Sequence, residues 1–200
     1  GRDWLQPMAA SWSRCSSFMF THNWWHLALF QLELSEFDAA LTLYDEQVWT
    51  QRKGHVHDQV NAISLLLRLE VRGADVGNRW QEVAEYAALN TADQLNGFVD
   101  LHMLYALCRA GDSHNAEQMW QGIQAQGQQE LKNGNEVWSS VMLPAAEAFR
   151  AHANGDYGYA AKLLGDNRAR LSELGGSTIQ QQWYDEIMTD CRLPQAKARA

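Results

Sequence analysis

A short signature occurs three times in this 200-residue chain and restricts it to a narrow set of folds. It reads "SEFDAA", "GDSHNA" and "GDYGYA", beginning at residues 35, 111 and 155, and each copy places alanine five residues after a small residue. A small residue favours the left-handed conformation that ends many helices, and alanine lets the next helix approach closely. The signature therefore predicts helix–turn–helix hairpins that repeat along the chain.

The apolar residues between these turns are spaced as in helices nearly everywhere. Trp24, Leu27, Ala28 and Leu32 share one helix face, and no segment alternates apolar and polar residues over the length of a strand. Pro144 lies inside one expected helix and predicts a kink there. Besides the two helices around the first turn, we expect helices over residues 2–11, 57–72, 77–89, 96–110, 113–127, 135–154, 156–174 and 177–191.

The three signatures are 76 and 44 residues apart, which fits a period of 38–44 residues if one degenerate unit lies in "LLLRLEVRGADVGNRWQEVAEYA". Repeats of this length are typical of helical solenoids. The first hairpin resembles the tetratricopeptide repeat at Trp24, Leu27 and Ala28, and again at Ala40 and Tyr44. We therefore predict an all-α chain, a right-handed α–α superhelix of antiparallel hairpins, forming a single domain over residues 1–200.

Three longer segments resemble the tetratricopeptide repeat domain 38 family. They are "HNWWHLALFQLELSEFDAALTLYDEQV", "LLLRLEVRGADVGNRWQEV" and "RLSELGGSTIQQQWYDEIM", in the family's order, although Gln181 stands where the family has arginine. Family members are about twice as long, so the resemblance implies the C-terminal half of a longer architecture. It also implies a concave inner face, and it implies no particular reaction.

The composition excludes some classes of partner. A net charge of −8 with scattered basic residues argues against nucleic acid. The apolar runs are too short to span a bilayer, so we expect no membrane association. Three cysteines without metal-ligand spacing fit a reducing compartment, and we predict a cytoplasmic protein.

The most unusual stretch is "HNWWH" at residues 22–26. His22 and His26 are one helical turn apart and therefore lie on one face. The repeat alignment places them toward the inner groove, where His102 of a later hairpin takes the place equivalent to His26. The predicted ligand- or partner-binding residues are His22, Asn23, Trp25, His26, Phe98, Leu101, His102, Tyr105 and Arg79.

These residues allow several interpretations. The histidines and tryptophans can be purely structural, with the rings filling space between helices. Our main prediction is an interaction or scaffold module that binds a peptide or protein in the groove, with no cofactor and no metal. The alternative is an enzyme or a small-molecule or metal-binding protein, and the catalytic candidates are then His26, His102, Asp58 and Asp100. Self-association through the terminal helix 2–11, burying Trp4 and Leu5, is a third possibility.

Overall fold

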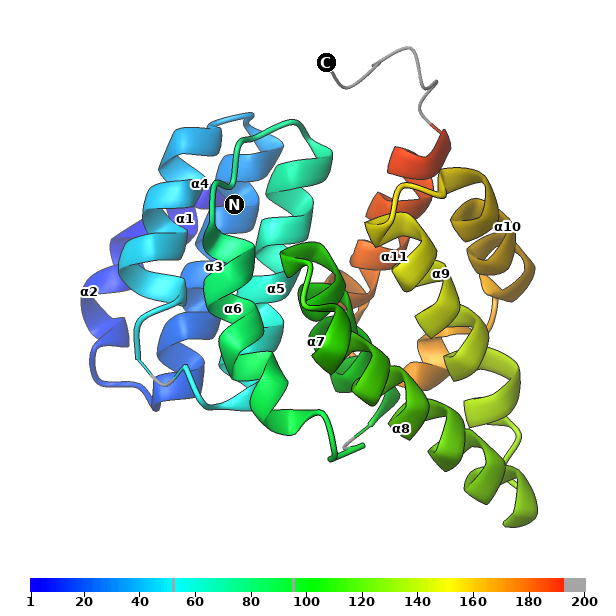
Figure 1. Ribbon diagram of the computed structural model, residues 1–200. Helices are drawn as coiled ribbons and strands as arrows, with labels where there is room; N and C mark the ends of the chain where they lie inside the picture. Colours follow the sequence, from blue (N-terminus) through cyan, green and yellow to red (C-terminus); the bar gives the residue numbers. More distant parts are fainter. Residues whose placement is uncertain (52, 95, 193–200) are drawn as a thin grey trace. The chain divides into compact units, whose positions relative to one another are not determined.

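The computed structural model describes residues 1–51, 53–94 and 96–192 of the chain (Figure 1). These described residues form helices joined by turns and contain no strand, which confirms the all-α prediction. The chain divides into two units, unit 1 over Gly1–Tyr86 and unit 2 over Ala87–Ala200. The single domain over residues 1–200 stays a prediction, and each unit is described by itself.

Unit 1 is built around two long helices, α3 and α5, which pack against each other. The short helix α4 follows α3 and contacts it. A π-helical turn, η2, extends α4 and lies against both long helices. The bounds are α1 Arg2–Leu5, η1 Gln6–Met8, α2 Ala9–Trp12, α3 Ser17–Glu33, α4 Phe37–Leu43, η2 Tyr44–Val48, α5 Val56–Val71 and α6 Arg79–Ala87.

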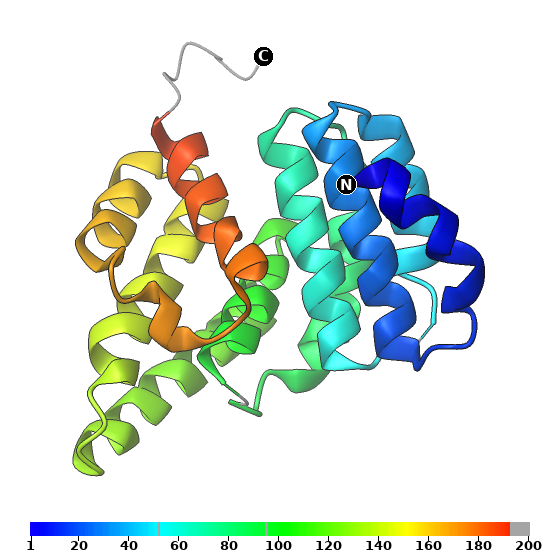
Figure 2. The ribbon, with the colours of Figure 1, turned by 180° about the vertical axis from the view of Figure 1, so that it is seen from behind.

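Unit 2 contains two hairpins, α7–α8 and α9–α10, and α11 lies along α10 (Figure 2). The first helices of the two hairpins, α7 and α9, pack on each other as α3 and α5 do in unit 1. The bounds are η3 Ala88–Asn90, α7 Gly97–Ala110, α8 Ser113–Lys132, η4 Trp138–Met142, α9 Leu143–Ala153, α10 Tyr157–Asn167, η5 Leu171–Leu174 and α11 Thr178–Arg192.

The three signatures form turns with the same hydrogen bonds. The backbone is left-handed at Ser35, Gly111 and Gly155, with φ of 59°, 76° and 82°. In each turn this residue donates its N–H to the carbonyl three residues earlier, and the following N–H bonds to the carbonyl five residues before it. This is the Schellman pattern, which satisfies the last carbonyls of a helix. The alanines at the close approach are buried, which confirms their predicted packing role (Ala40, Ala116 and Ala160).

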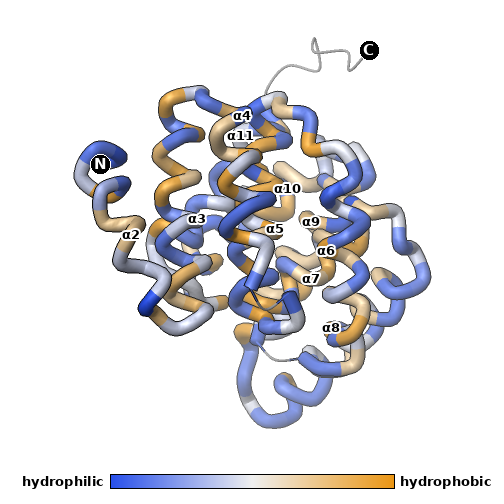
Figure 3. The backbone as a smooth tube through the Cα atoms, turned by 90° about the vertical axis from the view of Figure 1, so that its left-hand side faces the viewer, coloured by the Kyte–Doolittle hydropathy of each residue, from blue (hydrophilic) through white to orange (hydrophobic). Residues whose placement is uncertain are grey.

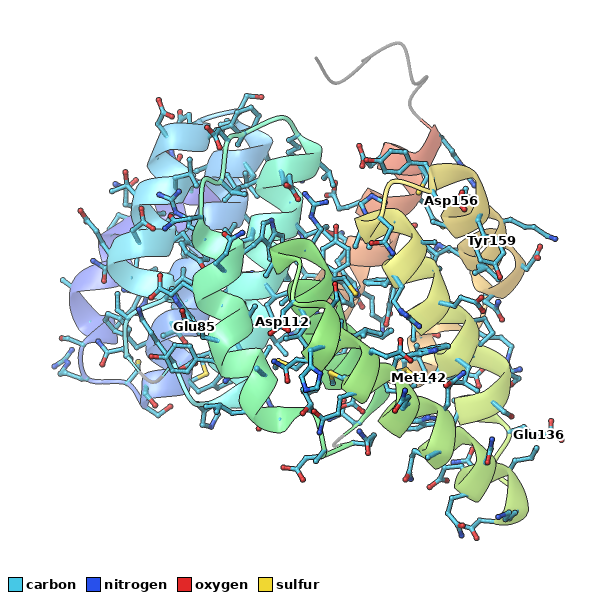
Figure 4. All side chains as sticks on the ribbon, in the orientation of Figure 1. Glu85, Asp112, Glu136, Met142, Asp156 and Tyr159 are labelled. Carbon is cyan, nitrogen blue, oxygen red and sulfur yellow. The ribbon has the colours of Figure 1, made fainter. Side chains whose placement is uncertain are left out.

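The second helix of each hairpin in unit 2 begins with an aspartate cap. The Asp112 carboxylate accepts from the N–H of Asn115 and the Asp156 carboxylate from that of Tyr159, both at 3.2 Å. Figure 4 labels Asp112, Asp156 and Tyr159. Such a cap satisfies one of the free donors at a helix start. In unit 1 the corresponding residue, Glu36, makes no side-chain cap. In each of these two turns, glycine therefore ends the first helix and the aspartate after it begins the second.

Some helix boundaries differ from the sequence predictions. Helix α8 continues past residue 127 to Lys132. Gly127 lies inside the helix, at a close contact where a Cβ atom would be 3.0 Å from Trp138 and Leu143. The predicted helix 156–174 breaks after Asn167, whose side-chain amide donates to the carbonyl of Leu163 at 2.9 Å and competes with the backbone ladder. At Pro144 the helix changes from the π-helical turn η4 to α9, because proline has no N–H to give to the preceding turn.

Hydrophobic and hydrophilic segments alternate along many of the helices (Figure 3). Helices α5 and α7 differ, because every residue of Asp58–Leu69 and of Gly97–Leu107 is buried. In unit 2, the largest buried ring is Trp183 of α11, which contacts Phe149 of α9 with ring centroids 4.4 Å apart. The aromatic rings of α7, α9 and α11 thus form one cluster in this unit. The packing ties the last helix to the two hairpins.

Candidate functional site

The "HNWWH" stretch lies in the middle of α3, where two imidazole rings touch. Ser16 caps this helix by accepting from the N–H of Met19. One turn further on, His22 Nε2 lies 3.2 Å from His26 Nε2, and His22 Nδ1 lies 3.2 Å from Asn61 Oδ1 of α5. The His22 ring is also stacked between the rings of Phe18 and Trp25. Asn61, His22 and His26 therefore form a hydrogen-bonded chain at the contact of α3 and α5.

The partners of His22 decide which of its nitrogens carries a proton. An amide oxygen only accepts, so His22 Nδ1 must donate to Asn61, and His22 Nε2 is left as an acceptor. The bond between the two rings is then donated by His26 Nε2. Burial and, to a smaller extent, the neighbouring His22 together lower the pKa of His26 to about 4. Burial also lowers the pKa of His22, so both rings are neutral at pH 7.

Polar contacts on either side of this chain attach α3 to α5. Thr21 donates to Asp58 Oδ1 at 2.7 Å, and Trp25 Nε1 donates to Ser64 Oγ at 3.0 Å. The Arg68 guanidinium lies over the Trp25 ring, 5.6 Å from its centroid, and donates to the Ser64 carbonyl at 3.0 Å. Buried hydrogen bonds of this kind are stabilising when both partners are satisfied. They fix the rotation of α3 and hence the positions of its histidines.

This orientation of α3 contradicts the prediction made for one site residue. Trp25 was expected to line an exposed groove with His22 and His26, but its side chain is fully buried. The ring turns toward α5 because its N–H bonds to Ser64 and its face contacts Arg68. Asn23, His22 and His26 are half-buried and do reach the surface. Arg79, the other candidate in unit 1, forms a two-pronged ion pair with Asp45 at 2.6 and 2.8 Å.

The candidates in unit 2 lie in its interior. Phe98, Leu101, His102 and Tyr105 are buried, so the prediction that they line an exposed groove is wrong. The His102 ring is stacked on Trp183 with centroids 3.5 Å apart, and its Nδ1–H donates to the Phe98 carbonyl at 2.7 Å. The packing of α11 on α7 thus covers this helix face.

The four catalytic candidates divide between the units. His26 and Asp58 belong to unit 1, whereas His102 and Asp100 belong to unit 2, where both are buried. Asp58 is buried as well and is held by Thr21. Only His26 among the four reaches solvent. Their catalytic role stays a prediction.

Unit 2 also contains a buried relay that sequence analysis missed. His152 of α9 lies between Asp190 of α11, at 2.9 Å from Nε2, and the hydroxyl of Tyr105 of α7, at 3.0 Å from Nδ1. The carboxylate accepts from Nε2–H, which leaves Nδ1 to accept from the tyrosine. The relay connects three helices, and its side chains are at most a few per cent exposed. Its burial indicates a structural role.

Other features bear on chemistry. Within residues 1–51, 53–94 and 96–192, no group of three His, Cys, Asp or Glu side chains is placed to hold a metal ion. Cys108 and Cys191 are partly buried, and burial raises their thiol pKa to about 11 and about 12, while Cys15 is exposed.

No helix of the described chain is long and apolar enough to cross a membrane. Trp4 of α1 is 69% exposed, and the self-association predicted for this segment stays a prediction.

No model of a known protein family matches the chain, and no solved structure matches it.

Proposed function

We propose that this chain is an interaction module of tetratricopeptide-like hairpins, related to the tetratricopeptide repeat domain 38 family, which binds a peptide along α3. The observation that supports it most is the repeated turn. Ser35, Gly111 and Gly155 share one backbone conformation and one pair of hydrogen bonds, as expected of repeated hairpins. Arrays of such hairpins commonly serve as binding surfaces, because each added unit extends the same face.

The binding surface we propose is a stripe on the outer side of α3, which we call the α3 stripe. Its residues follow one another at helical spacing, and each is exposed or half-buried. Apolar side chains stand toward its two ends, with Met19 41% and Phe30 36% exposed. Neutral imidazoles and an amide lie between them. The α3 stripe consists of Met19, His22, Asn23, His26, Phe30 and Glu33.

This arrangement favours a peptide with two apolar anchors and a polar group between them. Apolar pockets or patches give a short peptide most of its affinity, while hydrogen bonds set its position. Asn23 donates through its amide, whereas the N–H groups of His22 and His26 are already donated within the hydrogen-bonded chain. His26 Nδ1 is left as an acceptor. The ligand therefore presents a carbonyl or carboxylate oxygen to Asn23 and an N–H group to His26. The cytoplasm is the compartment we propose for this binding.

Selection of peptides from a random displayed library tests this function. The enriched peptides should bind the wild type and a His114→Ala control equally, since His114 is an exposed histidine on α8 of unit 2. They should bind a His22→Ala/His26→Ala variant at least about tenfold more weakly, because each lost polar contact weakens binding by a factor of several. Enriched peptides that bind the double variant as well as the wild type would place the binding surface elsewhere.

An enzyme is the second candidate, and one observation favours it. A histidine oriented by a second group is the arrangement used in acid–base catalysis, and Asn61, His22 and His26 form such a chain. The lowered pKa of His26, about 4, makes it a weak base at neutral pH and supports the binding function instead. Hydrolysis of a panel of chromogenic esters, absent in the double variant and present in the His114→Ala control, would favour the enzyme.

A further inference from the structure

The contact between His22 and His26 has a geometry that a metal ion can use. The two Nε2 atoms are 3.2 Å apart on consecutive turns of α3. In a tetrahedral zinc site with Zn–N bonds of about 2.05 Å, two nitrogen ligands are about 3.3 Å apart. The two donor atoms are therefore already at the separation that a shared ion requires. In the free protein the two Nε2 atoms point at each other, so the rings must turn for both lone pairs to converge on the ion.

Asn61 supplies a second, independent observation. Histidines that bind metals usually donate their other ring N–H to an oxygen, which fixes the tautomer and the ring orientation. His22 Nδ1 makes this bond to Asn61 Oδ1, and Asn61 is buried on α5. The Nε2 lone pair of His22 is thus free of its proton and held toward His26. Stacking between Phe18 and Trp25 restricts the ring further.

We propose that His22 and His26 form a two-point chelate for a divalent transition-metal ion, with Zn²⁺, Ni²⁺ and Cu²⁺ as the class of ligand. Imidazole nitrogens suit these ions, whereas Mg²⁺ and Ca²⁺ prefer oxygen. The described residues bring no third protein ligand into place, so the remaining positions are open to water or to a group on another molecule. This inference goes beyond the peptide-binding function and does not depend on it.

The protons balance in a simple way. Before binding, His26 donates its Nε2–H to His22, and both rings are neutral. Binding needs both Nε2 lone pairs, so the proton on His26 Nε2 moves to its own Nδ1 by exchange with solvent. His22 keeps its proton on Nδ1, where Asn61 accepts it. Both rings remain neutral, and the ion gains two ligands without a net proton release.

Calorimetric titration of the tag-free wild-type protein with Zn²⁺ provides the first test. We expect one equivalent to bind, and we expect His22→Ala and His26→Ala each to weaken binding at least about tenfold, because a single imidazole loses the chelate. His114→Ala is the matched control, because it removes an exposed histidine of unit 2. This variant should retain affinity within about twofold. Unchanged affinity in either of the first two variants would overturn the proposal.

Imidazole ¹⁵N spectra of the wild type provide a second test that needs no variant. Zn²⁺ should shift the Nε2 resonances of His22 and His26 and leave those of His102 and His152 unchanged, because the latter two rings are buried. No shift at His22 and His26 under a tenfold excess of Zn²⁺, or shifts confined to His55, His57 or His114, would overturn the proposal. A failed peptide selection beside a positive Zn²⁺ titration would reject the proposed function and leave this inference standing.

Discussion

In unit 1, His22 and His26 lie half-buried on α3, and their ring nitrogens face each other. In unit 2, His102 and His152 are buried. The His102 ring stacks on Trp183, and the His152 ring is hydrogen-bonded to Tyr105 and Asp190. Histidine thus lies in the packed interior of unit 2 and reaches the surface in unit 1. Burial is therefore what separates the two pairs of histidines, because a ligand can reach only a ring that is partly exposed.

The largest expected effect is in the aromatic cluster of unit 2. Replacing Trp183 by alanine removes a buried ring from between α7, α9 and α11, and we expect the free energy of unfolding to fall by about 4 kcal/mol. Urea denaturation followed by circular dichroism measures this loss. Trp4→Ala is the matched control, because Trp4 is 69% exposed, and it should cost less than about 0.5 kcal/mol.

The buried relay should come next. In His152→Phe, the carboxylate of Asp190 and the hydroxyl of Tyr105 each lose their bond to the ring, and we expect a loss of about 3 kcal/mol. The same change at His26, which is partly solvated, should cost less than about 1 kcal/mol. Equal losses at the two positions, measured by urea denaturation, would contradict the contrast between the units.

Substitutions in the repeated turns should change stability by a smaller amount, and in opposite directions in the two units. Gly111 has a φ of 76°, which strains any other residue, so Gly111→Ala should destabilise unit 2 by about 1 kcal/mol. Ser35 already holds a φ of 59° with a side chain, so Ser35→Gly should relieve strain and stabilise unit 1 by roughly 0.5 kcal/mol. Melting temperatures from calorimetry distinguish the two signs.

The smallest effect is a pH dependence of unit 1. The pKa of His26 is about 4 in the folded chain, below its ordinary value of 6.5, so the unfolded chain binds a proton first as the pH falls. Stability from this group is therefore complete above pH 6.5 and is lost progressively toward pH 4. The total is under about 1 kcal/mol because the ring is partly solvated.

A comparison with His26→Gln isolates this contribution from that of other groups. Between pH 7 and pH 5, the wild type should lose more of its free energy of unfolding than the variant. A variant that loses as much as the wild type would show that His26 titrates normally in the folded chain.

The sequence predicted the hairpins well, because their determinants are local. A small residue at the turn and alanine five residues later define each one, and Ser35, Gly111 and Gly155 adopt the expected conformation. The predicted helix 113–127 stops short of Lys132, where α8 ends. Gly127 is a close-contact position against Trp138 and Leu143, and this contact depends on the packing of the segment that follows α8.

The candidate site was only partly predictable. The spacing of His22 and His26 placed them together correctly, since one helix fixes it. The burial of His102 depends on Trp183, and the relay depends on His152 and Asp190, which come from separate helices. No spacing in the chain relates such residues. Asn61, which orients His22, was missed for the same reason.

The three cysteines make the chain convenient to label. A thiol reacts with maleimide as its thiolate, and thiol pKa values of about 11 and about 12 leave Cys108 and Cys191 almost wholly protonated at neutral pH. Cys15 is exposed and lies immediately before the capping residue of α3. A single fluorophore can therefore be attached next to the helix that carries the histidine pair, without mutating any residue.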